Sequence, residues 1–341
     1  MKKALSYDDI TLVPQFSSIR SRDEADTSIK LGKFNLKVPI ISANMDTITE
    51  DVMAVSLYKL GAVGALHRFM SIEQNVKQYS NVVENGCDCW VSIGVKHPEW
   101  IERFAALYDV GARNFVVDVA HGHSVLVKET VEKIHKNWSN ITVMAGNIST
   151  YEAAKDLISW GVHILKVGIG PGSCCKTRVV TGHGVPMFTS IIDCFLAVDE
   201  SKKDVAIVAD GGIRSSGDIV KALTAGANAV MIGSLFAGTK ETPGHVETSS
   251  SGKYKKFRGM ASTEARLEHK MSTCSAEEGV SSVVPYKGKV EVILNELKMG
   301  IKSGMSYCNA RTINEIYSHA QWCEQTHSGF IEGTPHIFGV K

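Results

Sequence analysis

The feature that most constrains the fold of this chain is a series of eight short apolar runs between residues 38 and 238. Nearly continuous apolar runs of this length, rich in β-branched residues, are typical of parallel strands buried on both faces. Segments of helical spacing lie between most of them, such as Val125–Lys136, Thr150–Trp160 and Ser215–Ala225. The runs are Val38–Asn44, Ala62–His67, Trp90–Val95, Asn114–Ala120, Ile141–Asn147, Ile164–Gly170, Val205–Gly212 and Ala229–Gly238. Eight strands that alternate with helices predict a (β/α)₈ TIM barrel, with an open doubly wound sheet as the alternative.

The alternation of predicted strands and helices ends after the eighth run. Residues 240–290 are polar and rich in Lys, Ser and Glu, which predicts a long loop with a mobile segment, a flap after strand eight. Val290–Arg311 has helical spacing and is expected to close the barrel, and the tail after Ile316 is expected to be irregular. We therefore expect residues 1–341 to form one catalytic barrel domain.

Composition narrows the class of protein. The 341 residues are 44% hydrophobic and carry a net charge of +1, which argues against a strongly basic nucleic-acid binder. No apolar run reaches the 18 residues of a membrane span, and the polar N-terminus does not resemble a signal peptide. The spacings of the eight cysteines match no zinc template, so free thiols in a cytoplasmic protein are expected.

Polar or glycine-rich groups follow nearly every predicted strand. In (β/α)₈ barrels the active site lies at these carboxyl ends, and the loops after strands seven and eight often hold phosphate. Here those loops carry Asp210-Gly211-Gly212 and Gly233-Ser234. Glycine lets backbone N–H groups approach an anion, whereas Asp210 suits a ribose hydroxyl. The alternative is a pair of tight turns without a ligand.

The loop after strand six, Gly168–Arg178, contains three glycines, a proline and two adjacent cysteines. Such a loop is exposed, so a thiol on it is poorly placed to belong to the core. A thiolate is an intrinsically good nucleophile, and cations or loop N–H groups favour it. The loop therefore indicates a nucleophilic cysteine, with an inert loop cysteine as the alternative.

Within this loop, Gly170–Arg178 resembles the GPGS-x-C-T-T-R signature shared by the IMP dehydrogenase and GMP reductase family. The resemblance extends from Tyr7-Asp8-Asp9-Ile10 to Ser306-Tyr307. It implies that Cys175, the second residue after Ser173, attacks C2 of a purine nucleotide, GMP or IMP. Lys176 departs from the family's threonine at the next position, which leaves the role of that side chain open.

The resemblance also implies roles for other residues. Thr177 and Glu278 match the pair that manages proton traffic at C2. The substrate would contact Ser173, Asp210, Gly211, Gly212, Gly233, Ser234, Met260 and Ser262. Asp118, Ala120 and Asn147 would lie at the nicotinamide riboside of the cofactor. Backbone carbonyls of Gly170, Gly172 and Cys175 are candidate ligands of a monovalent cation, potassium, and the family forms homotetramers.

The choice between the two family reactions favours GMP reductase with NADPH. Only 21 residues separate Arg68 from Trp90, which leaves no room for the regulatory CBS modules of most dehydrogenases. The dehydrogenase flap carries an Arg-Tyr pair that activates water, whereas Arg266 is followed here by Leu267. Val284–Gly288 and Glu332–His336 resemble the dehydrogenase instead. An IMP dehydrogenase without CBS modules, a nucleotide-sensing paralogue and a flavin barrel are the alternatives, and the preference for NADPH over NADH is open.

Overall fold

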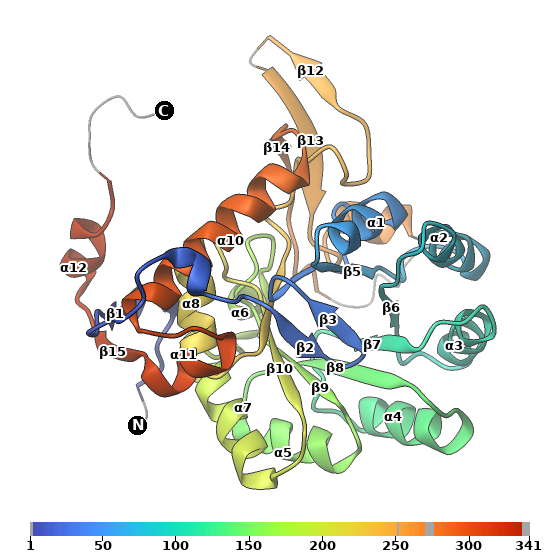
Figure 1. Ribbon diagram of the computed structural model, residues 1–341. Coiled ribbons are helices and arrows are strands. Elements are labelled where there is room, and N and C mark those ends of the chain that lie inside the picture. Colours follow the sequence, from blue (N-terminus) through green and yellow to red (C-terminus); the bar gives the residue numbers. More distant parts are fainter. Residues whose placement is uncertain (1–2, 251, 270–275, 336–341) are drawn as a thin grey trace.

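The central feature of the computed structural model is a closed barrel of eight parallel strands (Figure 1). The structure describes residues 3–250, 252–269 and 276–335. The barrel strands are β4 (Ile40–Ser42), β5 (Val63–Leu66), β6 (Trp90–Ile93), β7 (Asn114–Asp118), β8 (Thr142–Ile148), β9 (Ile164–Val167), β10 (Ala206–Asp210) and β11 (Ala229–Ile232). Each pairs with its neighbours in chain order, and β11 closes the ring by pairing with β4. The predicted (β/α)₈ barrel is confirmed.

Helices alternate with the strands and surround the barrel. Serine caps set where several begin: Ser71 and Ser215 each accept from a backbone N–H at the third helical position. The surrounding helices are α1 (Asp51–Lys59), α2 (Ile72–Glu84), α3 (Glu99–Asp109), α4 (Val125–Asn137), α5 (Tyr151–Ser159), α7 (Met187–Ser201), α8 (Ser216–Thr224) and α10 (Val290–Tyr307). The short α6 (Thr177–Thr181) lies in the loop after β9. The predicted helix Val290–Arg311 is thus present, ending four residues earlier.

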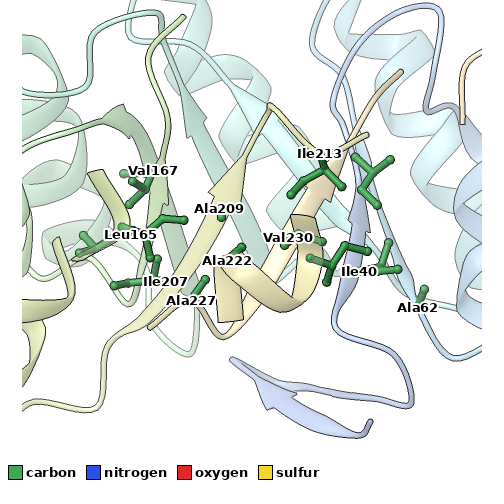
Figure 2. Close-up of a cluster of buried hydrophobic side chains, with 14 of the residues drawn as sticks. Ile40, Ala62, Leu165, Val167, Ile207, Ala209, Ile213, Ala222, Ala227 and Val230 are labelled. Carbon is green, nitrogen blue, oxygen red and sulfur yellow. The ribbon is translucent and has the colours of Figure 1, made fainter. Parts of the chain in front are cut away.

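Alternation along each strand divides the apolar side chains between two cores. In β10, Ile207 and Ala209 belong to the core between barrel and helices, and Figure 2 shows them gathered with Ala222 of α8. Val208 belongs to the core inside the barrel. Each large aliphatic side chain buried in this way stabilises the fold by about 1.5–3 kcal/mol.

A small hairpin fills one end of the barrel interior. It consists of β2 (Ile29–Leu31) and β3 (Phe34–Leu36), and its Leu31 and Phe34 are buried in the interior core. The Phe34 ring lies 5.5 Å from that of Trp90, which begins β6. The hairpin therefore closes the amino-terminal end of the barrel and leaves the carboxyl end for a site.

The prediction of a long loop over residues 240–290 is wrong. The segment folds into a three-stranded antiparallel sheet, β12 (Glu247–Ser249), β13 (Gly252–Arg258) and β14 (Ser281–Pro285), with helix α9 (Thr263–Glu268). Figure 1 shows this sheet projecting from the barrel in orange. We call the whole segment 240–290, sheet and helix together, the flap. The strand pattern of β13 is hidden because Lys255 and Arg258 hold two of its buried positions. Residues 251 and 270–275 of the predicted mobile segment lie outside the described residues.

The prediction of an irregular tail after Ile316 is also wrong. The tail contains α11 (Ile313–His319), β15 (Gln321–Glu324) and α12 (His327–Glu332), and β15 pairs antiparallel with β1 (Ile10–Val13) near the N-terminus. All four side chains of β15 are exposed, so no apolar alternation marks it as a strand. Two 3₁₀ turns, Tyr7–Asp9 and Arg22–Glu24, complete the N-terminal segment.

Two further properties follow from the described residues. No helix among them has both the length and the apolarity to cross a lipid bilayer. The seven described cysteines are all free thiols; Cys274 lies outside the described residues.

Gly168, directly after β9, provides a test of how closely the strands are packed. Its φ is +141°, and a Cβ there would lie 2.1 Å from the carbonyl oxygen of Asp210. We expect Gly168→Ala to destabilise the protein by about 3 kcal/mol or more, because left-handed strain and overpacking add. Gly86→Ala, where φ is +69° but the space is open, should cost only about 1–2 kcal/mol. Urea denaturation of both variants measures the difference, and equal losses would contradict the close packing at Gly168.

Candidate active site

A cavity of about 580 Å³ opens at the carboxyl ends of the barrel strands. This volume lies within the usual range for small-molecule sites. Its lining includes fifteen of the predicted site residues: Asp118, Ala120, Asn147, Gly170, Gly172, Ser173, Cys175, Thr177, Asp210, Gly211, Gly212, Gly233, Ser234, Met260 and Glu278. The structure therefore brings together side chains from five barrel strands and the flap.

Ser262 is the predicted site residue that the cavity lining does not include. Its side chain is buried and accepts from the Ala265 N–H as the N-cap of α9. Three histidines at strand ends also lie outside the lining. His67 is buried and accepts from the Phe69 N–H, and His123 lies 2.8 Å from the Asp156 carboxylate. His121, after β7, is the third histidine outside the lining.

The cysteine loop presents one thiol and hides the other. Between β9 and α6 a turn forms in which the Cys175 N–H donates to the Gly172 carbonyl. This turn buries Cys174, and burial raises the pKa of its thiol, whereas Cys175 is exposed. A thiol with a raised pKa is a poor nucleophile at neutral pH, so Cys175 is the better placed of the two.

Hydrogen bonds link the Cys175 thiol to a carboxylate of the flap. Its Sγ donates to the Thr177 hydroxyl at 3.2 Å, and that hydroxyl donates to Glu278 Oε2 at 2.7 Å. Backbone pairing holds the two segments together, since the Lys176 N–H donates to the Glu278 carbonyl and the Val280 N–H to that of Cys174. The arrangement can pass a proton between the carboxylate and an atom bound near the thiol.

The loops after β10 and β11 line part of the cavity with backbone. Gly211 and Gly212 have φ of +95° and +78°, and a Cβ on Gly211 would lie 2.9 Å from Pro171. Among the described residues, no protein acceptor contacts the backbone N–H groups of Gly212, Gly233 and Ser234. Free N–H groups on glycine-rich loops after strands seven and eight are typical of an anion site.

Lys166 is a site residue that the sequence alone did not single out. It lies on β9, is buried, and its ammonium reaches Asp210 Oδ2 at 2.5 Å, Asn147 Oδ1 at 2.8 Å and Asp118 Oδ1 at 3.3 Å. Burial disfavours the charged ammonium, but the two carboxylates outweigh it and raise the pKa of Lys166. Lys166 in turn helps lower the pKa of Asp118 against burial. A lysine inside the apolar run Ile164–Gly170 was the signal in the sequence.

A second buried ion pair anchors the flap. Arg258 of β13 donates to Asp46, which follows β4, with Nη2 to Oδ2 at 2.5 Å. The same oxygen of Asp46 lies 2.7 Å from His269 Nε2, and Arg258 also contacts Glu268 of α9. Arg258 and His269 lower the pKa of Asp46 although burial opposes them. This pair keeps the flap, with Met260, over the cavity.

Comparison with known proteins agrees with this geometry. Residues 4–336 match the model of the IMP dehydrogenase / GMP reductase domain. The chain is 36% identical to an inosine-5'-monophosphate dehydrogenase of Borreliella burgdorferi, covering 99% of this chain and 98% of that protein. It is 38% identical to the same enzyme of Cryptosporidium parvum, with 98% and 95% covered. It is 31% identical to a GMP reductase of Leishmania major, with 98% and 97% covered.

The chain belongs to the IMP dehydrogenase/GMP reductase family. Members of this family are oxidoreductases that act on purine nucleotides with a nicotinamide cofactor.

Within the family, the length of the chain does not separate the two activities. The alignment with the L. major GMP reductase runs over 481 positions, whereas that with the B. burgdorferi dehydrogenase runs over 402. Because this chain has 341 residues, a protein named GMP reductase carries more additional residues than one named IMP dehydrogenase. The missing insert between Arg68 and Trp90 is therefore no argument for the reductase.

Lys166→Met tests the buried charge cluster. The change leaves Asp118 and Asp210 without their shared cation, so we expect a loss of about 3–5 kcal/mol at pH 7 by urea denaturation. The lowered pKa of Asp118 contributes stability above the usual aspartate pKa, and this contribution is lost as the pH falls through the folded-state value. The deficit of the variant should therefore shrink below about pH 4. A deficit that does not change with pH would contradict the ion pairing.

Proposed function

We propose that this chain is a GMP reductase, which converts GMP, NADPH and a proton into IMP, ammonia and NADP⁺. The observation that carries the proposal is the composition of the flap. No tyrosine stands between Met260 and Glu278, and Arg266 is followed by the exposed Leu267. The Arg266 guanidinium donates to the Ala276 carbonyl. The flap thus lacks the Arg-Tyr pair that activates water in the dehydrogenase, so hydrolysis of a covalent intermediate would be slow.

The hydrogen-bonded chain of Cys175, Thr177 and Glu278 supports the first half of this reaction. The Cys175 thiol gives its proton through Thr177 to Glu278. The resulting thiolate forms a bond to C2 of the purine, and the bond from C2 to the amino nitrogen breaks with its electron pair on nitrogen. The departing amine must gain a proton, which Glu278 can deliver through Thr177. NADPH, when bound, supplies the hydride to C2. The C2–sulfur bond then breaks with its electron pair on Cys175, which releases IMP.

The lining of the cavity also supports a nucleotide in this orientation. The 5′-phosphate would accept from the free N–H groups of Gly212, Gly233 and Ser234, and from Ser173. The Oδ2 atom of Asp210 is held by Lys166 and Asn147. Its second oxygen is then oriented toward a ribose hydroxyl.

We assign the nicotinamide riboside to Asp118, Ala120 and Asn147, which line the same cavity. Potassium fits the loop before Cys175, because no donor among the described residues contacts the carbonyls of Gly170 and Cys175. The Gly172 carbonyl is already used by the Cys175 N–H. We further propose a cytoplasmic homotetramer, which light scattering of the purified protein tests.

IMP dehydrogenase is the second candidate. Two observations favour it: Arg266 lines the cavity, and several relatives named IMP dehydrogenase match at 31–38% identity against 30–31% for those named GMP reductase. That reaction converts IMP, NAD⁺ and water into XMP, NADH and a proton. In it the Arg266 guanidinium would have to release the Ala276 carbonyl and activate water.

Paired absorbance assays at 340 nm distinguish the two reactions. One cuvette holds GMP with NADPH, and the other holds IMP with NAD⁺, each with potassium or sodium. We expect loss of NADPH with release of ammonia in the first cuvette, abolished in Cys175→Ala and retained in Cys323→Ala, which removes another exposed thiol. Appearance of NADH in the second cuvette alone would overturn the proposal in favour of the dehydrogenase. Activity in neither would favour an altered nucleotide or a sensing role.

The proton path makes a separate prediction. Glu278→Gln keeps the shape of the side chain but not the carboxylate, so we expect kcat to fall by about 10²–10⁴. KM for GMP should change little, because Glu278 would act on the departing amine. A kcat within about twofold of the unchanged protein would show that the proton reaches C2 by another route.

A further inference from the structure

Beside the hydrogen bond from Thr177 to Glu278, a second side-chain contact joins the cysteine loop to the flap. Lys176 Nζ lies 3.0 Å from Glu277 Oε2. Thr177 and Glu278 are the next residues on each segment, so the two contacts are adjacent. Lys176 is also the position at which this chain departs from the threonine of the family signature.

Glu277 uses each of its carboxylate oxygens for a different element. Oε2 accepts from Lys176, and Oε1 accepts from the N–H at 3.0 Å and the hydroxyl at 2.8 Å of Thr263, which begins α9. These bonds lower the pKa of Glu277 to about 2, with Thr263 the largest cause and Lys176 a lesser one. The group is therefore a carboxylate at neutral pH. It connects the cysteine loop to the helix that carries Arg266.

We propose that the ion pair between Lys176 and Glu277 is a latch that fixes Glu278 against Thr177. Lys176 and Glu277 are then positioning residues for proton transfer. The inference rests on the proposed function for the identity of the proton acceptor. The backbone bonds from the Lys176 N–H to the Glu278 carbonyl and from the Val280 N–H to the Cys174 carbonyl fix the register of the two segments. The latch adds a side-chain contact at the end of this pairing, directly beside Glu278, and so restrains the direction of the Glu278 carboxylate.

The exposure of the pair explains why it acts on position rather than on stability. The side chains of Lys176 and Glu277 are 35% and 42% exposed, so water and salt screen their attraction. The catalytic rate is more sensitive than stability to small changes of position, because a displacement of about 1 Å at a reacting group can lower a rate by about 10²-fold. A weak contact beside the relay can therefore have a measurable catalytic effect.

Steady-state kinetics tests the latch with GMP and NADPH. We expect Lys176→Met and Glu277→Gln each to lower kcat by about tenfold with KM within about twofold, since the contact lies outside the nucleotide site. The charge exchange Lys176→Glu with Glu277→Lys should restore kcat to within about threefold. Lys256→Met is the matched control, because it breaks a flap ion pair to Glu264 of similar length, 3.1 Å, that does not touch the cysteine loop. Its kcat should equal that of the unchanged protein.

The dependence of kcat on ionic strength distinguishes the latch from a contact that only supports the fold. Raising sodium chloride from about 0.05 to 0.5 M should lower kcat of the unchanged protein severalfold, because screening weakens the pair. The Lys176→Met variant should show no such dependence. Equal salt dependence in both proteins would overturn the latch.

Alkylation of Cys175 tests the latch without any assumption about the reaction. The rate of iodoacetamide addition is followed by mass spectrometry of the Cys175 peptide in the protein without nucleotide. When the latch is broken, Glu278 no longer holds the Thr177 hydroxyl in place, and the Cys175 thiol loses its hydrogen bond to that hydroxyl. We therefore expect alkylation of Cys175 to accelerate severalfold in Lys176→Met and not in Lys256→Met. Unchanged alkylation with unchanged kcat would overturn the proposal. Accelerated alkylation in a protein that does not reduce GMP would sustain the latch and refute the proposed reaction.

Discussion

The candidate active site depends on a short stretch of backbone pairing between Cys174–Lys176 and Glu278–Val280. These segments are about a hundred residues apart, one on a loop of the barrel and the other on the flap. Their pairing places Glu278 beside Thr177 and Thr177 beside Cys175. Backbone groups buried between two segments must be paired, so the contact fixes the register of the flap on the cysteine loop.

Two buried cations then hold the remaining parts of the site. Lys166 joins Asp118 of β7 and Asn147 of β8 to Asp210 at the end of β10, and Arg258 joins the flap to Asp46 after β4. Buried charges are tolerated only when they are paired, so each cation fixes the carboxylates around it. The barrel supplies the framework, and these pairs determine how the strand ends face one another.

In the mechanism we propose, the relay of Cys175, Thr177 and Glu278 would serve either family reaction, because both would proceed through a bond from cysteine to C2. The two differ in whether ammonia or hydride leaves C2, and in whether water must be activated afterwards. Position and rotation of the flap therefore matter more than the identity of the nucleophile. In the proposed function, a flap with leucine after Arg266 and a lysine beside Cys175 would place Glu278 firmly and activate water poorly, which is the combination that a reductase needs.

The sequence by itself determined the barrel, because eight apolar runs at regular spacing have few ways to bury both faces of each strand. It also indicated the cysteine loop and the glycines after strands seven and eight, whose chemistry is local. Tertiary structure decided what depends on partners distant in the chain. The flap sheet was hidden because Lys255 and Arg258 occupy buried strand positions, and β15 because its side chains are all exposed. Lys166 is a strand residue of β9 whose role the sequence did not reveal, because that role depends on Asp118, Asn147 and Asp210, which only the fold brings around it.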